Sequence, residues 1–222
     1  MDFNDLVRLY EDTKKEYGDK AYRYISKILS KAKERHLKDF AGGDHEQSWR
    51  AFKGKNLEKL IEYIIVSEIK ELGLQIINGN TLEKSLDSNL SDELSKVKRN
   101  LLINYGEFGC HLPDIDIIVY NPKDSKVIAV LSIKVTLRER IAQTGYWKIK
   151  LSLSNLTKDI KVYFITLDED QTLKNKEKKG RAIVEMDTDG GYVLSENYIE
   201  ESDKVKTFDK FIEDLKKVID AR

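Results

Sequence analysis

Residues 111–150 read HLPDIDIIVYNPKDSKVIAVLSIKVTLRERIAQTGYWKIK, and they carry the clearest structural pattern in the chain. Two runs rich in Val and Ile, 115–120 and 126–136, flank the turn-forming residues Asn121-Pro122-Lys123-Asp124. Such runs around a turn predict a β-hairpin. Residues 138–151 then follow with helical periodicity. This stretch therefore predicts a hairpin that leads directly into a helix.

The flanking sequence supplies further helices and strands. Helices are expected as two segments in the first ~40 residues, and then at 45–73, 81–100 and 208–219. Strands are expected at 74–77, 161–167, 181–186 and 192–194. This order predicts an α/β (α+β) protein, in which a mixed β-sheet is flanked by helices and preceded by a helical N-terminal region.

The best candidate domain boundary is Ala41-Gly42-Gly43-Asp44, where the helical pattern breaks. We expect residues 1–44 to form a helical N-terminal region and residues 45–222 to form the main domain. No repeat of 20–50 residues is visible, which argues against a solenoid or a propeller.

The composition is that of a soluble globular protein, with 40% hydrophobic and 35% charged residues. The 39 basic and 39 acidic residues balance, which argues against a protein that coats DNA non-specifically. A single cysteine, the lack of a signal-peptide apolar region and the lack of a run near the ~18–20 apolar residues of a membrane span favour a cytoplasmic protein. Three histidines and one cysteine argue against a structural zinc site.

Candidate catalytic residues lie on the two predicted strands of the hairpin. Asp114 and Asp116 are two residues apart, and so are Ser132 and Lys134. Alternate residues of a strand point to the same face. If the strands pair, the carboxylates and the ammonium can meet at one edge of the sheet.

Such a meeting would serve phosphodiester chemistry. Carboxylate oxygens hold a hard cation such as Mg²⁺, which activates a water molecule and stabilises charge growing on a phosphate. The backbone carbonyl of Ile133 could complete the shell, and Lys134 could orient the water or stabilise the transition state. Glu58 and Glu62, four residues apart on the long predicted helix, are candidates for a third carboxylate.

Each of these residues also has a purely structural interpretation. A Pro-Asp pair is common turn chemistry, a strand lysine is usually solvated, and Glu58 and Glu62 could form the wet face of their helix with Lys55 and Lys59. The functional interpretation is favoured because Lys134 ends the apolar run 127–133, where a lone buried charge is costly.

Leu137-Arg138-Glu139-Arg140 follows the second strand and opens the next helix. Arg can donate two hydrogen bonds to guanine and Glu can accept one from cytosine, so this triplet could read a G:C step. Gln143 and Lys148 follow on the same helix and are further candidates for DNA binding. The alternative is a helix start with ordinary surface ion pairs.

Two sequence blocks carry a resemblance to a known family. Pro113-Asp114-Ile115-Asp116 with Ser132-Ile133-Lys134 resembles the signature of the PD-(D/E)XK nucleases. The continuation through Gln143 resembles the type II restriction endonucleases that read CCGG or CC:GG sequences, such as BsaWI and the catalytic domain of EcoRII. The resemblance covers roughly residues 54–150 and implies a restriction-endonuclease-like fold.

The resemblance implies roles for individual residues. Lys134 would be the catalytic lysine, and the base-reading residues would be Arg138, Glu139 and Arg140. A helix glutamate, Glu58 or Glu62, would belong to the metal site, and Glu58 is preferred because Gly54-x-x-x-Glu58 resembles the helix pattern of related nucleases.

The chain departs from the family pattern in two places. Ser132 stands where an acid usually precedes the lysine, and Trp147 and Lys148 stand where the CCGG group has a compensating helix acid. The third acidic ligand therefore stays open, as does the choice between Asp114 and Asp116 as the essential carboxylate.

The leading hypothesis is a Mg²⁺-dependent type II restriction endonuclease that cuts double-stranded DNA at a short palindrome containing CC/GG pairs. Two-fold symmetry of the site predicts a homodimer, to which residues 1–44 would add dimer contacts or a DNA clamp. The alternatives are a structure-specific or repair nuclease of the same superfamily and a non-catalytic DNA-binding module.

Overall fold

The computed structural model describes residues 2–138 and 140–221. The helices are α1 (Phe3–Tyr17), α2 (Ile25–Asp39), α3 (His45–Glu71), α4 (Gly79–Lys84), α5 (Asp92–Arg99), α6 (Arg140–Ser152), α7 (Lys179–Asp187) and α8 (Phe211–Asp220). The strands are β1 (Gln75–Asn78), β2 (Ile103–Asn104), β3 (Cys110–His111), β4 (Ile117–Asn121), β5 (Lys126–Lys134), β6 (Lys161–Thr166), β7 (Gly190–Val193) and β8 (Val205–Thr207). Short 3₁₀ turns are Gly18–Tyr24, Asp87–Asn89, Gly106–Phe108 and Phe208–Lys210.

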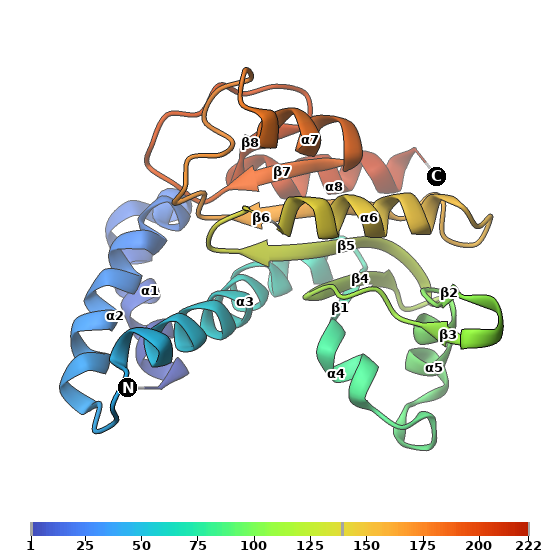
Figure 1. Ribbon diagram of the computed structural model, residues 1–222, viewed down its shortest axis with the longest axis horizontal. Coiled ribbons are helices and arrows are strands. Elements are labelled where there is room, and N and C mark those ends of the chain that lie inside the picture. Colours follow the sequence, from blue (N-terminus) through green and yellow to red (C-terminus); the bar gives the residue numbers. More distant parts are fainter. Residues whose placement is uncertain (1, 139, 222) are drawn as a thin grey trace.

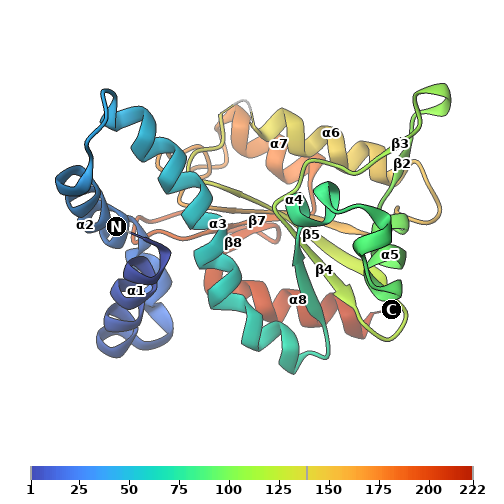
Figure 2. The same ribbon diagram turned by 90° about the horizontal axis from the view of Figure 1, so that it is seen from below.

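Six strands form one mixed sheet in the order β1-β4-β5-β6-β7-β8, and β2 pairs with β3 in a separate hairpin. The β1–β4 and β4–β5 pairs are antiparallel, whereas the pairs from β5 to β8 are parallel. Helices α6 and α7 cover one face of the sheet, and α3 and α8 cover the other (Figures 1 and 2). The expected mixed sheet flanked by helices is confirmed.

Strand β5 lies in the middle of this sheet, and its interior residues are all buried. A strand covered on both faces has a continuous apolar run rather than an alternating one. Its neighbour β4 shows the division between the faces. Ile117 and Val119 join the core under α3 and α8, whereas Ile118 and Tyr120 join the core on the opposite face.

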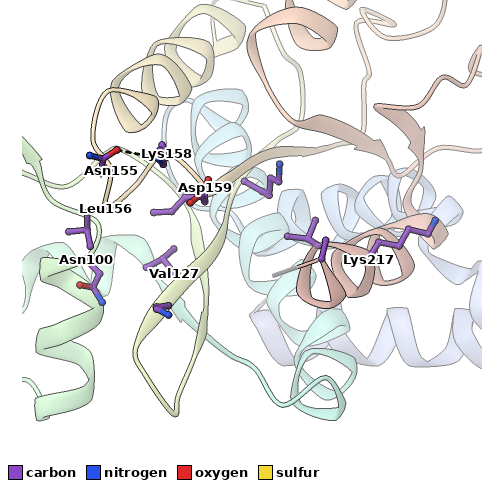
Figure 3. A pocket seen from close by; sticks show the side chains of 12 residues that line it. Asn100, Val127, Asn155, Leu156, Lys158, Asp159 and Lys217 are labelled. Atoms are coloured by element: carbon purple, nitrogen blue, oxygen red, sulfur yellow. Dashed lines mark hydrogen bonds between the residues drawn. The ribbon is translucent and has the colours of Figure 1, made fainter.

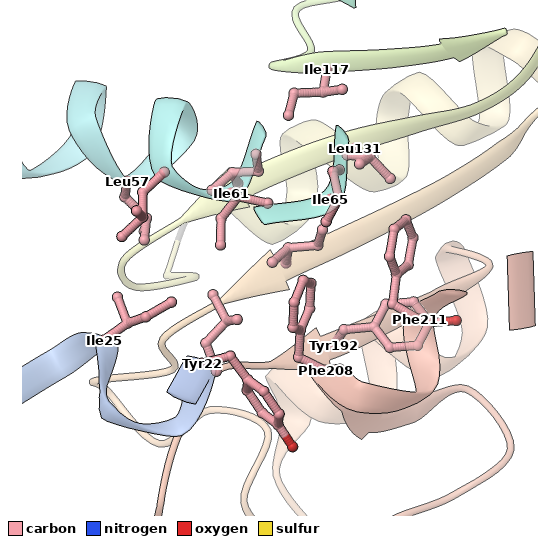
Figure 4. Packing of buried hydrophobic residues seen from close by; sticks show 14 of the residues in the cluster. Tyr22, Ile25, Leu57, Ile61, Ile65, Ile117, Leu131, Tyr192, Phe208 and Phe211 are labelled. Carbon is pink, nitrogen blue, oxygen red and sulfur yellow. The ribbon is translucent and has the colours of Figure 1, made fainter. Parts of the chain in front are cut away.

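The larger core includes the N-terminal helices. Ile25 of α2 and Tyr22 of the preceding turn lie in the same cluster as Leu57 and Ile61 of α3 and Phe211 of α8 (Figure 4). Fully burying each such side chain contributes on the order of 1.5–3 kcal/mol. The described part of the N-terminal region, residues 2–44, is therefore packed against the main body through a continuous apolar core.

The predicted hairpin, the long helix and the strand at 161–167 are all present, within a few residues of the expected bounds. The strand predicted at 181–186 is wrong, because these residues lie in α7. Arg181 is fully buried there. Its Nε donates to Oε1 of Glu185, four residues later, over 2.8 Å. Its other two nitrogens donate to the carbonyls of Leu173 and Glu200. These contacts and the burial of Val184 impose the helix on a segment whose apolar residues suit a strand.

No helix in the described part of the chain is long and apolar enough to cross a membrane.

Candidate active site

Asp116 and Lys134 meet at the end of β5, as the paired strands allow. Lys134 Nζ donates to Asp116 Oδ2 over 2.6 Å, and the backbone N–H of Ile133 donates to the same oxygen over 2.5 Å. The Asp116 side chain is only 5% exposed and that of Lys134 is 24% exposed. A buried carboxylate is costly unless it is paired and hydrogen-bonded, and both conditions hold here.

Glu58 of α3 lies against this pair. Burial raises the pKa of its carboxyl group to about 7, and the negative charge of Asp116 and a hydrogen bond to the Asp116 carboxyl group add to the shift. Lys134 acts in the opposite direction, and Asp114 raises the pKa slightly further. Helix α3 therefore brings one glutamate to the carboxylates of the hairpin.

Glu62 lies one turn further along α3 and does not join this group. Burial raises the pKa of Glu62, and the neighbouring charge that acts on it is Lys59. Neither Asp116 nor Lys134 contributes to this shift. Of the two glutamates, Glu58 is therefore the one that contacts Asp116.

Asp114 has a different environment from Asp116. Asp114 is exposed, and its Oδ2 accepts a hydrogen bond from Gln143 Nε2 of α6 over 2.6 Å. Arg140 in turn donates to Gln143 Oε1 over 3.0 Å. A chain of hydrogen bonds thus joins the start of α6 to the carboxylate segment, a contact that the sequence reasoning missed because it treated Gln143 as a DNA contact alone.

Ser132 shows how the chain departs from the usual acid two residues before the lysine. Its side chain is buried, and its hydroxyl accepts a hydrogen bond from Thr144 of α6 over 3.3 Å. The neighbouring Gly145 is also buried, with Asp187 of α7 only 3.2 Å from where its Cβ would lie. The hydrogen bond from Thr144 thus places α6 directly against this position of β5.

The remaining predicted residues are dispersed. Arg138 and Arg140 are exposed at the start of α6, and Arg138 has a positive φ of 33°. Glu139 lies outside the described residues. Lys148 is turned away from this group, because its ammonium pairs with Asp189 at 2.6 Å and donates to the carbonyl of Ile160.

The donor set suits a hard divalent cation with several retained waters. Two carboxyl groups, Glu58 and Asp116, are close enough to share a hydrogen bond, and a cation between them would replace the shared proton. The carbonyl of Ile133 leaves β5 on the same side as its N–H, which contacts Asp116. Within residues 2–138 and 140–221, no set of three or more Asp, Glu, His or Cys side chains is arranged around one point. Backbone and water would therefore complete the shell, as Mg²⁺ commonly requires.

A hollow of about 840 Å³ lies at the opposite end of the sheet (Figure 3). It is lined by Lys126, Lys158, Lys161 and Lys217 among others. Each of these lysines has a partner nearby. Lys126 pairs with Asp124, Lys161 with Asp189 and Lys217 with Glu213, and Lys158 donates to Asn155 Oδ1. This hollow is separate from the buried Asp116–Lys134 pair.

Comparison with known proteins places this geometry in a family. The profile of the BsaWI restriction endonuclease family, type 2, matches residues 93–214, which include Asp114, Asp116 and Lys134. The chain belongs to the BsaWI family of type II restriction endonucleases. A protein of Methanocaldococcus jannaschii that is named as type II restriction enzyme MjaVIP is 38% identical over 97% of this chain and 93% of its own length.

Solved restriction endonucleases share the fold. BsaWI in a pre-specific DNA complex is 14% identical, with a TM-score of 0.54 over 99% of this chain and 93% of its own. AgeI in a specific DNA complex is 13% identical, with a TM-score of 0.57 over 89% of this chain and 82% of its own. The mixed sheet of this BsaWI-family endonuclease is therefore the restriction-endonuclease fold.

Proposed function

We propose that this restriction endonuclease uses Mg²⁺ to hydrolyse both strands of duplex DNA at a short palindromic site containing CC/GG pairs. The observation that carries the proposal is the buried Asp116 carboxylate, which contacts the Lys134 ammonium on one side and Glu58 on the other. Restriction endonucleases generally use a divalent metal, and this donor set fits one.

Glu58 and Asp116 would hold the cation, with Asp114 at the exposed margin of the site. When bound, the cation would activate a water molecule and stabilise the charge growing on the scissile phosphate. Asp116 holds the Lys134 ammonium in place by their 2.6 Å contact. From there Lys134 would orient the attacking water or donate to a non-bridging phosphate oxygen.

Base reading would fall to the start of α6. Arg138, Glu139 and Arg140 directly follow the catalytic strand, so side chains that read bases and side chains that cut the backbone are separated by only a few residues. Arg138 and Arg140 are exposed, as direct readout in the major groove requires. Gln143 would couple Arg140 to Asp114 through the two hydrogen bonds described above.

Lys148 has a weaker case as a DNA contact. Its ammonium is already paired with Asp189, and this pair ties α6 to the segment before β7. We infer a structural role for Lys148 in place of the proposed DNA contact.

We further propose a homodimer, because one copy of the Asp116–Lys134 site can cut one strand and a palindrome presents two equivalent strands. Residues 1–44 and residues 45–222 would remain the functional divisions, with the first acting as a dimer contact or a DNA clamp. Because the N-terminal helices share the larger core, this region would act as a rigid arm.

The test is digestion of a long, sequenced duplex DNA by purified protein with Mg²⁺, followed by sequencing of the fragment ends. EDTA and Lys134→Ala are the controls. Discrete ends sharing one palindrome with CC/GG pairs are the expected result. Cuts that follow DNA shape and not sequence would indicate a structure-specific nuclease, and binding without cleavage would indicate a non-catalytic module.

A further inference from the structure

The β2–β3 hairpin has no part in the chemistry proposed above. It is short, its turn (Gly106–Phe108) is exposed, and Gly106 and Gly109 have positive φ angles of 67° and 83°. At the turn the Phe108 side chain is 74% exposed. An isolated two-stranded hairpin is at best marginally stable in water, so an ordered one needs external support.

Helix α6 supplies this support. The hydroxyl groups of Tyr105 and Tyr146 are 3.2 Å apart, and Lys150 Nζ lies 5.2 and 5.5 Å from the centres of the two rings. Cation–π contacts of this kind contribute about 0.5–1 kcal/mol at exposed sites. A ring nitrogen of His111 also hydrogen-bonds the carbonyl of Phe108 at 2.9 Å, which ties the turn to its own strand.

The same helix connects the hairpin to the candidate active site. Gln143, Tyr146 and Lys150 are three and seven residues apart, so they lie along one face of α6. Gln143 contacts Asp114 at one end of this row, and Lys150 contacts the hairpin at the other. The hairpin and the connection between α2 and α3 project from the same side of the molecule, at its opposite ends (Figure 2).

The distance to the site is limited by the chain itself. Eight residues separate Phe108 from Asp116, so their Cα atoms are at most about 28 Å apart. One turn of B-DNA is about 34 Å long. Phe108 therefore lies no further from a scissile phosphate at Asp116 than about the length of one helical turn.

The composition of the hairpin restricts what it can bind. Residues 103–111 contain no Lys or Arg, so they cannot grip phosphates by charge. An exposed aromatic ring on a braced turn can instead contact bases, by stacking or by wedging between steps from the minor groove.

We propose that the β2–β3 hairpin is a DNA-contacting arm whose Phe108 ring packs against bases beside the cut site. The proposal rests on the proposed cleavage of duplex DNA, which it extends to a specific element.

Binding of a duplex that contains the cut site, identified from the wild-type fragment ends, tests the arm. Fluorescence anisotropy with EDTA present measures affinity without cleavage. We expect Phe108→Ala to weaken binding about 5- to 150-fold, the range that loss of one base–aromatic stack gives, and Phe108→Trp to retain it. Tyr198→Ala is the matched control, because Tyr198 is an aromatic residue of equal exposure, 75%, outside the site and the hairpin.

Photocrosslinking provides a measurement that needs no variant. A duplex with 5-iodouracil at successive positions within one turn of the cut should crosslink to the peptide that contains Phe108. If Phe108→Ala binds like wild type and no position crosslinks to this peptide, the arm is excluded while the nuclease proposal stands. If Phe108→Ala changes only the molecular mass in light scattering, the hairpin is a protein–protein contact. A wild-type protein that neither binds nor cuts duplex DNA overturns both proposals.

Discussion

The two ends of β5 both carry a lysine, in contrasting environments. Lys126 at its start is 71% exposed and pairs with the exposed Asp124 at 3.3 Å. It lines the hollow shown in Figure 3. Lys134 at its end pairs with the buried Asp116 at 2.6 Å. Exposed ion pairs contribute about 0–1 kcal/mol, whereas breaking a buried pair leaves an uncompensated charge. The end with buried charge, and not the end beside the hollow, is where chemistry is expected.

The largest expected effect separates these two lysines. Lys134→Ala should lower the cleavage rate about 10²- to 10³-fold, the loss typical of removing one donor to a developing negative charge. Lys126→Ala should cut at the wild-type rate, because its ion pair is solvated. Single-turnover cleavage of plasmid DNA measures both, and equal rates for the two variants would remove the distinction between the ends of β5.

Asp168, just beyond β6, is a second buried carboxylate. In the part of the chain that the structure describes, it has no lysine contact as close as the one between Lys134 and Asp116. Burial raises its pKa from 3.8 to about 6, although the backbone N–H of Leu173 donates to both of its oxygens and opposes the shift. Because the folded state holds this proton more tightly, the group's contribution to stability should fall as pH rises from about 4 to about 6.

The size of the Asp168 effect follows from these pKa values, and it corresponds to about 3 kcal/mol over the full range. Asp168→Asn should remove this dependence, and asparagine tolerates the positive φ of 49° at this position. Urea unfolding of both proteins at pH 4 and pH 7 gives the difference. Parallel stability curves for wild type and variant would mean that Asp168 is already ionised at pH 4 in the folded protein.

Substitutions of Glu58 and Glu62 test which turn of α3 contributes to the metal site. Glu58→Gln should reduce Mg²⁺-dependent cleavage on the order of 10²-fold, because it would remove one of two side-chain ligands to the cation. Glu62→Gln should have little effect, since the charge that acts on Glu62 is Lys59. Cleavage rates across a Mg²⁺ titration compare them, and a stronger loss in Glu62→Gln would move the metal site one turn along the helix.

The smallest effect is expected at the margin of the site. Gln143→Leu removes the hydrogen bond to Asp114, and the loss of about 1–1.5 kcal/mol corresponds to roughly a tenfold slower reaction. Arg140 would lose its contact with Gln143 in the same variant. Rates measured on the cognate site and on a site with one changed base pair show whether the loss is one of positioning or of specificity. An unchanged rate on both sites would leave the Arg140–Gln143–Asp114 chain without a role.

The Val- and Ile-rich runs and the turn residues within 111–150 were sufficient to predict the hairpin and the helix after it, and the pairing of its strands brings Asp116 to Lys134. Local patterns predict such features because two strand-forming runs joined by a short turn have few ways to pair. The same local reasoning gave the wrong structure at 181–186. There the buried Arg181 and its bonds to Glu185, Leu173 and Glu200 decide the conformation.

The sequence by itself predicted the sheet with its flanking helices, because these depend on periodicity, and its resemblance to known nucleases over residues close together in the chain predicted the family. Tertiary structure alone decided that Glu58 rather than Glu62 approaches Asp116, that Ser132 is enclosed by α6, and that Lys148 pairs with Asp189. The physical reason is that each of these contacts joins elements far apart in sequence. Their relative rotation is set by the packing of α3 and α6 on the sheet, about which helical periodicity carries no information.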